Sequence, residues 1–222
     1  PYTVYQNINS LLPSHYLVFY EDSEVEINKY YSSEINEFKM LRIEEAQVLI
    51  RNILGRSVKK HIVSDTEVGL LLSGGIDSSV LASEMADNPG KFKTFTMGFE
   101  NKSFDESKYA DIVAEKFNTE HKSRKFSSSD CVRILENVVA QMEQPFADHS
   151  VLPMYLLSEF SSSYLKVVLA GDGGDEVFLG YQTYIAHKLF NWYRNIPRNL
   201  QRKVFKAVLM FLPRSDRYFS LG

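Results

Sequence analysis

The first forty residues alternate short apolar runs with polar segments. Tyr16–Tyr20 and Val25–Ile27 are rich in aromatic and β-branched residues and lie on either side of an acidic, serine-containing segment. This pattern predicts a β-hairpin. Because the apolar residues take up a helical period after this point, we expect residues 1–40 to be a linker or the end of a preceding domain, and residues 41–222 to form a second domain.

Strand-like and helix-like segments alternate along the rest of the chain. Val68–Leu72 is an unbroken apolar run before two glycines, which is typical of a strand buried on both faces of a parallel sheet. The predicted elements are helix 43–61, strand 68–72, helix 78–86, strand 94–99, helix 105–117, strand 121–126, helix 130–142, helix 151–161 and strand 166–169. The predicted fold class is therefore α/β, a doubly wound parallel sheet with flanking helices that binds ligands beyond the carboxyl ends of its strands.

The composition is that of a globular protein, with 44% hydrophobic and 24% charged residues and a net charge of −3. So small a charge gives no electrostatic case for binding nucleic acid or a membrane surface. The apolar stretches are far too short to span a bilayer. Cys131 is the only cysteine, which excludes an internal disulfide and favours a packing role for its thiol. These features fit a cytoplasmic protein.

The first predicted strand leads into a loop rich in glycine and serine, Ser73–Ser79. Its two glycines allow a tight turn with uncovered N–H groups, and the helix that follows adds the positive end of its dipole. Such a loop can cradle phosphates, although it lacks the lysine of a Walker loop. Asp77 would repel a phosphate unless it holds a Mg²⁺ ion that bridges to the ligand. The alternative is an ordinary turn followed by a helix cap.

The last predicted strand leads into a second loop, Ala170–Tyr181, in which three glycines and three acidic residues share six positions. In a parallel sheet this loop lies at the same edge as the first one. We therefore expect Asp77 and Asp175 to face one Mg²⁺ ion, which usually takes one or two protein carboxylates and completes its shell with water and phosphate oxygens. The alternative is a solvated acidic turn. The spacing of the acidic residues does not fit an EF-hand.

The two loops together resemble a known family. Ser73–Ser79 matches the S-G-G-x-D-S signature of the PP-loop ATP pyrophosphatases, and the second loop resembles the S-G-D/E-G-x-D-E-x-F-x-G-Y pattern of the asparagine synthetases. Glu143–Pro145 and Asp148–Leu156 resemble further segments of that family. The chain departs from the family pattern at Ala170, where serine is common, and at Met97, where a β-branched residue is common.

The resemblance implies the PP-loop ATP pyrophosphatase fold, also called adenine nucleotide alpha hydrolase-like, and an ATP-dependent ligase. Enzymes of this family join the side-chain carboxylate of aspartate to the α-phosphate of ATP and release pyrophosphate. Ammonia then attacks the β-aspartyl-AMP to give asparagine and AMP. ATP and Mg²⁺ are the cofactors implied, and aspartate or a similar carboxylate and ammonia are the partners.

The same resemblance assigns roles to individual residues of this sequence. Asp77, Asp175 and Asp172 would be catalytic, and the first two would also bind Mg²⁺. Asp105 and Asp148 are weaker candidates for binding the substrate amine, since each also fits a helix cap or a surface acid. The ATP-binding residues implied are Leu72, Ser73, Gly74, Gly75, Asp77, Ser78, Ser79, Met97 and Gly171.

The family also has parts that this sequence does not match. Its ammonia comes from an N-terminal glutaminase domain with an N-terminal cysteine, whereas this chain begins with Pro1. Its lysine downstream of the second loop has no match before Gly222. We therefore expect residues 1–40 to be a linker or the end of a glutaminase domain, and the synthetase domain to be truncated at its C-terminus. The fragment alone is expected to be weakly active or inactive, and a homodimer stays open.

Three other functions stay open. The protein could amidate or cyclise another carboxylate, or it could be a PP-loop enzyme that modifies tRNA, although the second acidic loop argues against the latter. It could also bind ATP without catalysis. Between Lys188 and Arg217 lie eight basic residues and one acidic residue. We interpret them as the polar face of a helix pair over residues 200–212, because no aromatic platform for nucleic acid accompanies them.

Overall fold

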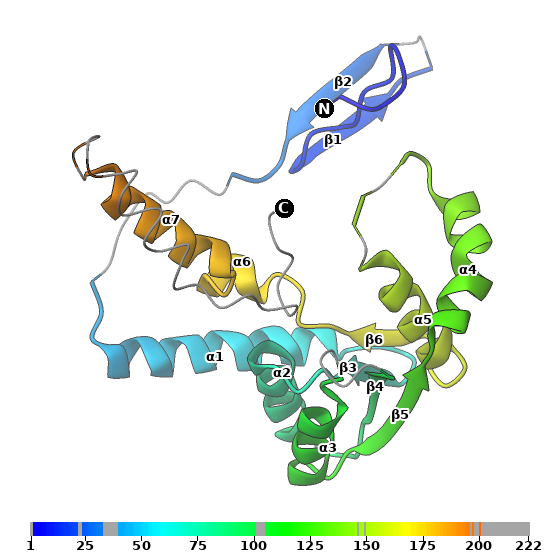
Figure 1. Ribbon diagram of the computed structural model, residues 1–222, viewed down its shortest axis with the longest axis vertical. Coiled ribbons are helices and arrows are strands. Elements are labelled where there is room, and N and C mark those ends of the chain that lie inside the picture. The colour runs from blue at the N-terminus through cyan, green and yellow to red at the C-terminus, as the bar shows by residue number, and fades with distance from the viewer. Residues whose placement is uncertain are drawn as a thin grey trace. The chain divides into compact units, whose positions relative to one another are not determined.

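The computed structural model describes residues 2–21, 24–32, 40–100, 105–145, 147–148, 150–195, 197 and 200 (Figure 1). The chain divides into two compact units. The first comprises Pro1–Ser57 and Ser128–Leu156, and the second comprises Val58–Ser127 and Leu157–Gly222. The domain division at residue 40 stays an expectation. The helix pair expected over residues 200–212 and most of the basic segment lie outside the described residues.

The first unit contains the hairpin. Strand β1 (His15–Phe19) pairs antiparallel with strand β2 (Val25–Lys29), so the predicted hairpin is confirmed. The same unit holds most of helix α1 (Ile43–His61), helix α4 (Ser128–Gln141) and the first half of helix α5 (Val151–Ser162). These three helices fall within a few residues of their predicted positions. The apolar residues of α1 and α4 recur at a clear helical period.

The second unit is built on a sheet of four parallel strands in the order β5-β4-β3-β6 (Figure 1). The strands are β3 (Val68–Leu71), β4 (Lys93–Phe99), β5 (Glu120–Phe126) and β6 (Val167–Leu169). The helices are the rest of α5, with α2 (Ile76–Ala86), α3 (Ser107–Lys116), α6 (Gly174–Phe178) and α7 (Gln182–Arg194). The predicted parallel sheet with flanking helices is confirmed, whereas α6 and α7 are not among the predicted elements.

Both faces of this sheet are covered, which explains the unbroken apolar run of β3. On one face Leu70 and Leu72 form a core with residues of α2 and α3, such as Met85 and Ala110. On the other face Phe95 is fully buried and its ring packs edge-on against Phe160 of α5, with ring centroids 6.0 Å apart. Burial of each large apolar side chain of this kind stabilises the fold by about 1.5–3 kcal/mol.

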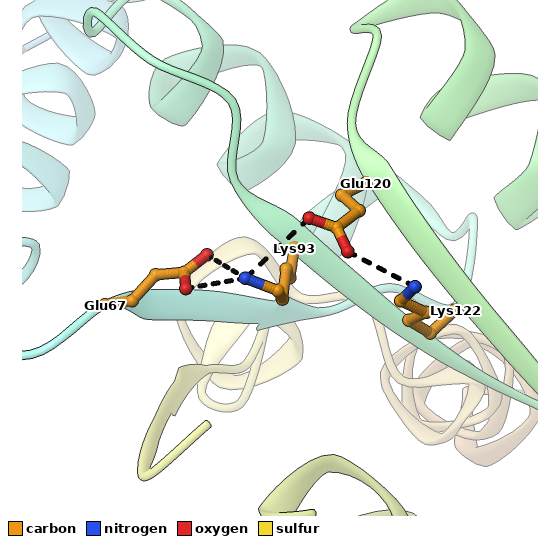
Figure 2. Close-up of polar contacts among 4 residues, drawn as sticks. All are labelled: Glu67, Lys93, Glu120 and Lys122. Carbon is orange, nitrogen blue, oxygen red and sulfur yellow. Dashed lines mark hydrogen bonds and ion pairs between the residues drawn. The ribbon is translucent and has the colours of Figure 1, made fainter. Parts of the chain in front are cut away.

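The amino ends of three neighbouring strands carry a chain of ion pairs (Figure 2). Lys93 is the first residue of β4, and its Nζ lies 2.6 and 2.7 Å from the two carboxylate oxygens of Glu67. The same Nζ lies 3.7 Å from one carboxylate oxygen of Glu120. Lys122 contacts Glu120 at 3.2 Å. The hydrogen bond with Glu67 raises the pKa of Lys93, and the bond with Lys122 lowers the pKa of Glu120. These contacts join β3, β4 and β5 at the edge of the sheet opposite to the two glycine-rich loops.

A polar cluster lies between β4, β5 and α3. The hydroxyl of Thr94 lies 2.7 Å from Nδ1 of His121 and 2.8 Å from the hydroxyl of Thr119. Nε2 of His121 is buried and has no hydrogen-bond partner among the described residues, although a carboxylate oxygen of Asp111 lies 3.4 Å away. Burial lowers the pKa of His121, and the charge of Asp111 opposes that shift.

We expect the stability of the fold to fall as the pH drops below 6.5, the ordinary pKa of histidine. The folded-state pKa of His121 lies below the unfolded-state value. Just below pH 6.5 the histidine therefore binds a proton in the unfolded state but stays neutral in the folded state. Because the unfolded state binds more protons, the unfolding free energy rises with pH. His121→Gln should flatten this slope, whereas a matched His187→Gln change on the exposed side of α7 should preserve it. Urea titrations from about pH 5 to 8 measure the slope. A slope unchanged in the His121 variant would contradict the expectation.

Candidate active site

The two glycine-rich loops follow neighbouring strands at the point where the order of the sheet reverses. After β3 the chain adds β4 and β5 on one side, and then returns to pair β6 with the other side of β3. Leu70 of β3 lies opposite Leu169 of β6, so the loops after these strands leave the same edge of the sheet. This is the position at which open α/β sheets bind their ligands.

The first loop makes a tight turn into the start of α2. Gly74 has a φ of +81°, and a Cβ atom there would lie against the backbone N of Ala110, 2.5 Å from the carbonyl carbon of Tyr109 and 2.6 Å from its Cβ. Gly75 is the N-cap residue of α2 and has no side-chain capping bond. The uncapped N–H groups and the helix dipole are the features of an anion site.

The serine hydroxyls of this loop shape it from within. Ser78 is 5% exposed, and its Oγ lies 3.3 Å from the backbone N of Ser73, 3.1 Å from the Ser73 hydroxyl and 3.3 Å from the carbonyl oxygen of Gly75. The hydroxyl of Ser79 donates to the same carbonyl at 2.6 Å. The N–H of Gly75 also donates within the loop, to the Ser73 hydroxyl at 3.2 Å, so the serine hydroxyls hold the turn.

The second loop packs directly on Asp77. A Cβ atom on Gly174 would lie 2.5 Å from Cγ of Asp77 and 2.8 Å from each of its carboxylate oxygens. A Cβ atom on Gly171 would lie 3.1 Å from Cβ of Asp77 and 3.3 Å from the backbone N of Ser78. The carboxylate of Asp77 thus lies on the residue that precedes Asp175. The sequence carries one signal for this contact, the run of glycines among the acidic residues of the second loop.

The carboxylate of Asp175 lies against the return of its own loop. A Cβ atom on Gly180 would meet Oδ1 of Asp175 and would lie 2.9 Å from its Cγ. Among the described residues there is no cluster of three or more His, Cys, Asp or Glu that could hold a metal. The expected Mg²⁺ site has only two carboxylates, so it stays a prediction. Donors of this type suit Mg²⁺, which fills the rest of its shell with water and phosphate oxygens.

The other candidate residues are distributed around this edge of the sheet. The side chain of Leu72 is buried in the core, its N–H donates to Phe95 at 2.8 Å, and its carbonyl accepts a bond from the hydroxyl of Thr96. Met97 is half-buried on β4, and Asp172 is exposed. The sequence gives no signal for this hydrogen bond of Thr96, because a threonine inside a strand is an ordinary β-former.

The two weaker candidates lie in different units. Asp105 belongs to the second unit and accepts a bond from the backbone N–H of Ser107 at 3.2 Å, at the carboxyl end of β4 where Gly98 leaves room for it. Hydrogen bonding by Ser107 lowers the pKa of Asp105, and the charge of Lys125 adds to that shift. Asp148 belongs to the first unit and accepts a bond from the N–H of Ser150 at 2.8 Å. Asp105 is therefore at the edge of the sheet that carries the two loops.

Comparison with known proteins gives one consistent result. The family model of asparagine synthase matches residues 49–221. A provisionally named glutamine-hydrolysing asparagine synthetase 2 from Methanocaldococcus jannaschii is 36% identical over 208 residues, which cover 90% of this chain and 39% of that protein. Glutamine-hydrolysing asparagine synthetase 1 from Bacillus subtilis is 29% identical over 223 residues, which cover 100% of this chain and 35% of that protein. The chain thus spans less than half the length of these relatives.

Among solved structures, the chain is similar to a glutamine-dependent NAD⁺ synthetase from Acinetobacter baumannii in complex with ADP. The sequence identity is 18% and the TM-score is 0.45, over 74% of this chain and 31% of that chain. This likeness is too slight to add to the argument. No helix in the described part of the chain is long and apolar enough to cross a membrane. With the family model matching most of the residues and both glycine-rich loops in place, the chain belongs to the asparagine synthase family.

Proposed function

We propose that this chain is the ATP-using part of a ligase that converts aspartate to asparagine through a β-aspartyl-AMP intermediate, with release of AMP and pyrophosphate. Family membership supports ATP-dependent amidation. The observation that carries the proposal is the contact of the Asp77 carboxylate with the backbone of Gly174 at the switch point of the sheet. This contact brings a phosphate-type loop and an acidic loop together, as an adenylating site requires.

In this proposal the residues of the chain have distinct tasks. A carboxylate oxygen of aspartate attacks the α-phosphorus of ATP while the bond from that phosphorus to the bridging oxygen breaks. The uncapped N–H groups at the start of α2 receive the pyrophosphate that leaves. Asp77 and Asp175 would hold Mg²⁺, which neutralises charge on the phosphates when it is bound.

The remaining candidates act at the nucleoside and at the second substrate. Leu72, Met97 and Gly171 would border the nucleoside, with Leu72 contributing backbone because its side chain is in the core. Asp172 and Asp105 would act on the aspartate side. Ammonia then attacks the activated carbonyl and AMP leaves. The names of the relatives support glutamine as its source, and a glutaminase domain of the same protein and a cytoplasmic location are part of the proposal.

Exchange of labelled pyrophosphate into ATP tests this function in the full-length protein. We expect exchange that requires both Mg²⁺ and aspartate, because adenylation is reversible only while the acyl-adenylate is held. Glutamate, one methylene longer, serves as the control acid. Exchange supported by another acid but not by aspartate would favour the family member that acts on a different carboxylate. Formation of ADP and phosphate would contradict adenylation.

A further inference from the structure

We propose that Tyr181 is a positioning residue that closes the second acidic loop through its hydrogen bond to Glu176, and so fixes where Asp175 lies relative to Asp77. The inference rests on the proposed function of that loop as part of a Mg–ATP site. None of the roles assigned above uses Glu176 or Tyr181. Both residues nevertheless lie next to the residues that define the site.

Two hydrogen bonds close the turn formed by α6 and the residues after it. The hydroxyl of Tyr181 donates to Oε1 of Glu176 at 2.6 Å, and the N–H of Gly180 donates to the carbonyl of Asp175 at 3.0 Å. The first of these bonds raises the pKa of Tyr181 to about 12 and lowers the pKa of Glu176. At neutral pH the bond therefore joins a protonated phenol to an ionised carboxylate, which is the stronger kind of hydrogen bond.

The backbone of this turn needs such support. Leu179 ends α6 with a φ of +59° in the left-handed region, a conformation that residues other than glycine adopt at a cost. With α6 only five residues long, the intrahelical bonds alone give little stability. The bond from Tyr181 to Glu176 spans the left-handed residue and holds the chain on both sides of it.

Opening this turn would move the metal carboxylate. Gly180 lies directly against the carboxylate of Asp175, and Gly174 lies directly against the carboxylate of Asp77. Asp175 therefore lies between Gly174, which contacts Asp77, and the closed end of its own loop at Gly180. If the hydrogen bond between Tyr181 and Glu176 breaks, the contact of Gly180 with the carboxylate of Asp175 should be the first to be lost.

A competing role for Glu176 is direct binding of Mg²⁺ through its charge. Four single variants of the full-length protein separate the two roles. Tyr181→Phe and Glu176→Ala each remove the bond, whereas Glu176→Gln removes the charge but keeps an acceptor for the tyrosine hydroxyl. Tyr184→Phe is the control, because it removes the hydroxyl of the neighbouring tyrosine on α7 and keeps its ring, whose centroid lies 6.0 Å from that of Tyr181.

Two measurements on each variant test the inference. Hydrogen exchange of residues 174–181 without nucleotide reports the turn itself, and calorimetric titration with Mg–ATP reports its effect on the site. We expect Tyr181→Phe and Glu176→Ala to speed up the exchange and to weaken Mg–ATP binding by roughly fivefold, the effect of one lost hydrogen bond. Glu176→Gln and Tyr184→Phe should stay close to the wild type in both.

The outcomes separate this inference from the proposed function. Unchanged exchange in Tyr181→Phe would overturn the inference, whether or not the protein binds ATP. Loss of Mg–ATP binding in Glu176→Gln equal to that in Glu176→Ala, with Tyr181→Phe unaffected, would also overturn it, because Glu176 would then act by its charge. A wild-type protein that does not bind Mg–ATP would refute only the proposed function. The hydrogen-exchange measurement would still decide the role of Tyr181.

Discussion

Replacing Asp77 by asparagine is expected to weaken binding of Mg–ATP by at least about tenfold, because loss of a ligand should cost no less than loss of an outer-shell partner of a metal. The structure predicts a second effect of this change, with the opposite sign, when Mg²⁺ is absent. Asp77 lies at the start of α2 beside uncapped N–H groups, so without Mg²⁺ its charge repels the phosphates of the nucleotide. In the presence of EDTA, Asp77→Asn should therefore raise the affinity for ATP.

Calorimetric titrations with and without Mg²⁺ measure both effects. Asp175→Asn should weaken Mg–ATP binding as Asp77→Asn does, because the proposed ion is shared by the two carboxylates. Asp87→Asn is the matched control, since Asp87 is exposed at the other end of the same helix. Equal Mg–ATP affinity in the Asp77 variant, the Asp175 variant and the wild type would exclude the shared metal site.

Replacing Gly74 by alanine is expected to lower the unfolding free energy by about 2–5 kcal/mol, the sum of a left-handed backbone without glycine and an overpacked contact. The new Cβ atom would press on the backbone of Tyr109 and Ala110 in the first turns of α3. Neither of these groups can rotate away as a flexible side chain could. The variant should also lose ATP binding, because the loop and α3 cannot both keep their positions.

Gly90→Ala separates the two causes of this effect. Gly90 also has a positive φ, +108°, but a Cβ atom there has no heavy atom within 4 Å. This variant should show the cost of the backbone conformation alone and should bind ATP normally. Chemical denaturation of both variants gives the difference. A Gly74 variant that is no less stable than the Gly90 variant would show that α3 does not press on the loop.

The sequence was sufficient to predict the hairpin, the parallel sheet and the two loops. Each of these rests on a local signal, such as the unbroken apolar run of Val68–Leu72 or the glycines that follow it. Helix α6 could not be predicted, because its five residues are too few to show a hydrophobic period and its first three are Gly-Asp-Glu. Helix α7 was missed although its apolar residues recur at a helical period as clearly as those of α1.

The sequence predicted that the two loops share one edge of the sheet, but it did not predict which residues touch there. The contact between Gly174 and Asp77 depends on β6 lying next to β3. This strand order cannot be read from the residues of either strand. The serines of the first loop are among the residues expected to bind ATP. The sequence did not predict that the buried hydroxyl of Ser78 bonds within the loop, to Ser73 and to the carbonyl of Gly75. Which residues bind the nucleotide and the metal stays a prediction at every one of these positions.

The pairing of β6 with β3 makes the site depend on the longest-range contact of the sheet. Val68 and Val167 are partners across 99 residues of chain (167 − 68), whereas Leu70 and Thr94 are 24 apart and Lys93 and Glu120 are 27 apart. Closing the longer loop costs about 1 kcal/mol more in chain entropy. With only three residues, β6 has few bonds to offset this cost. Partial opening of the protein should therefore detach β6 and its acidic loop first, and activity would be lost while the other three strands are still paired.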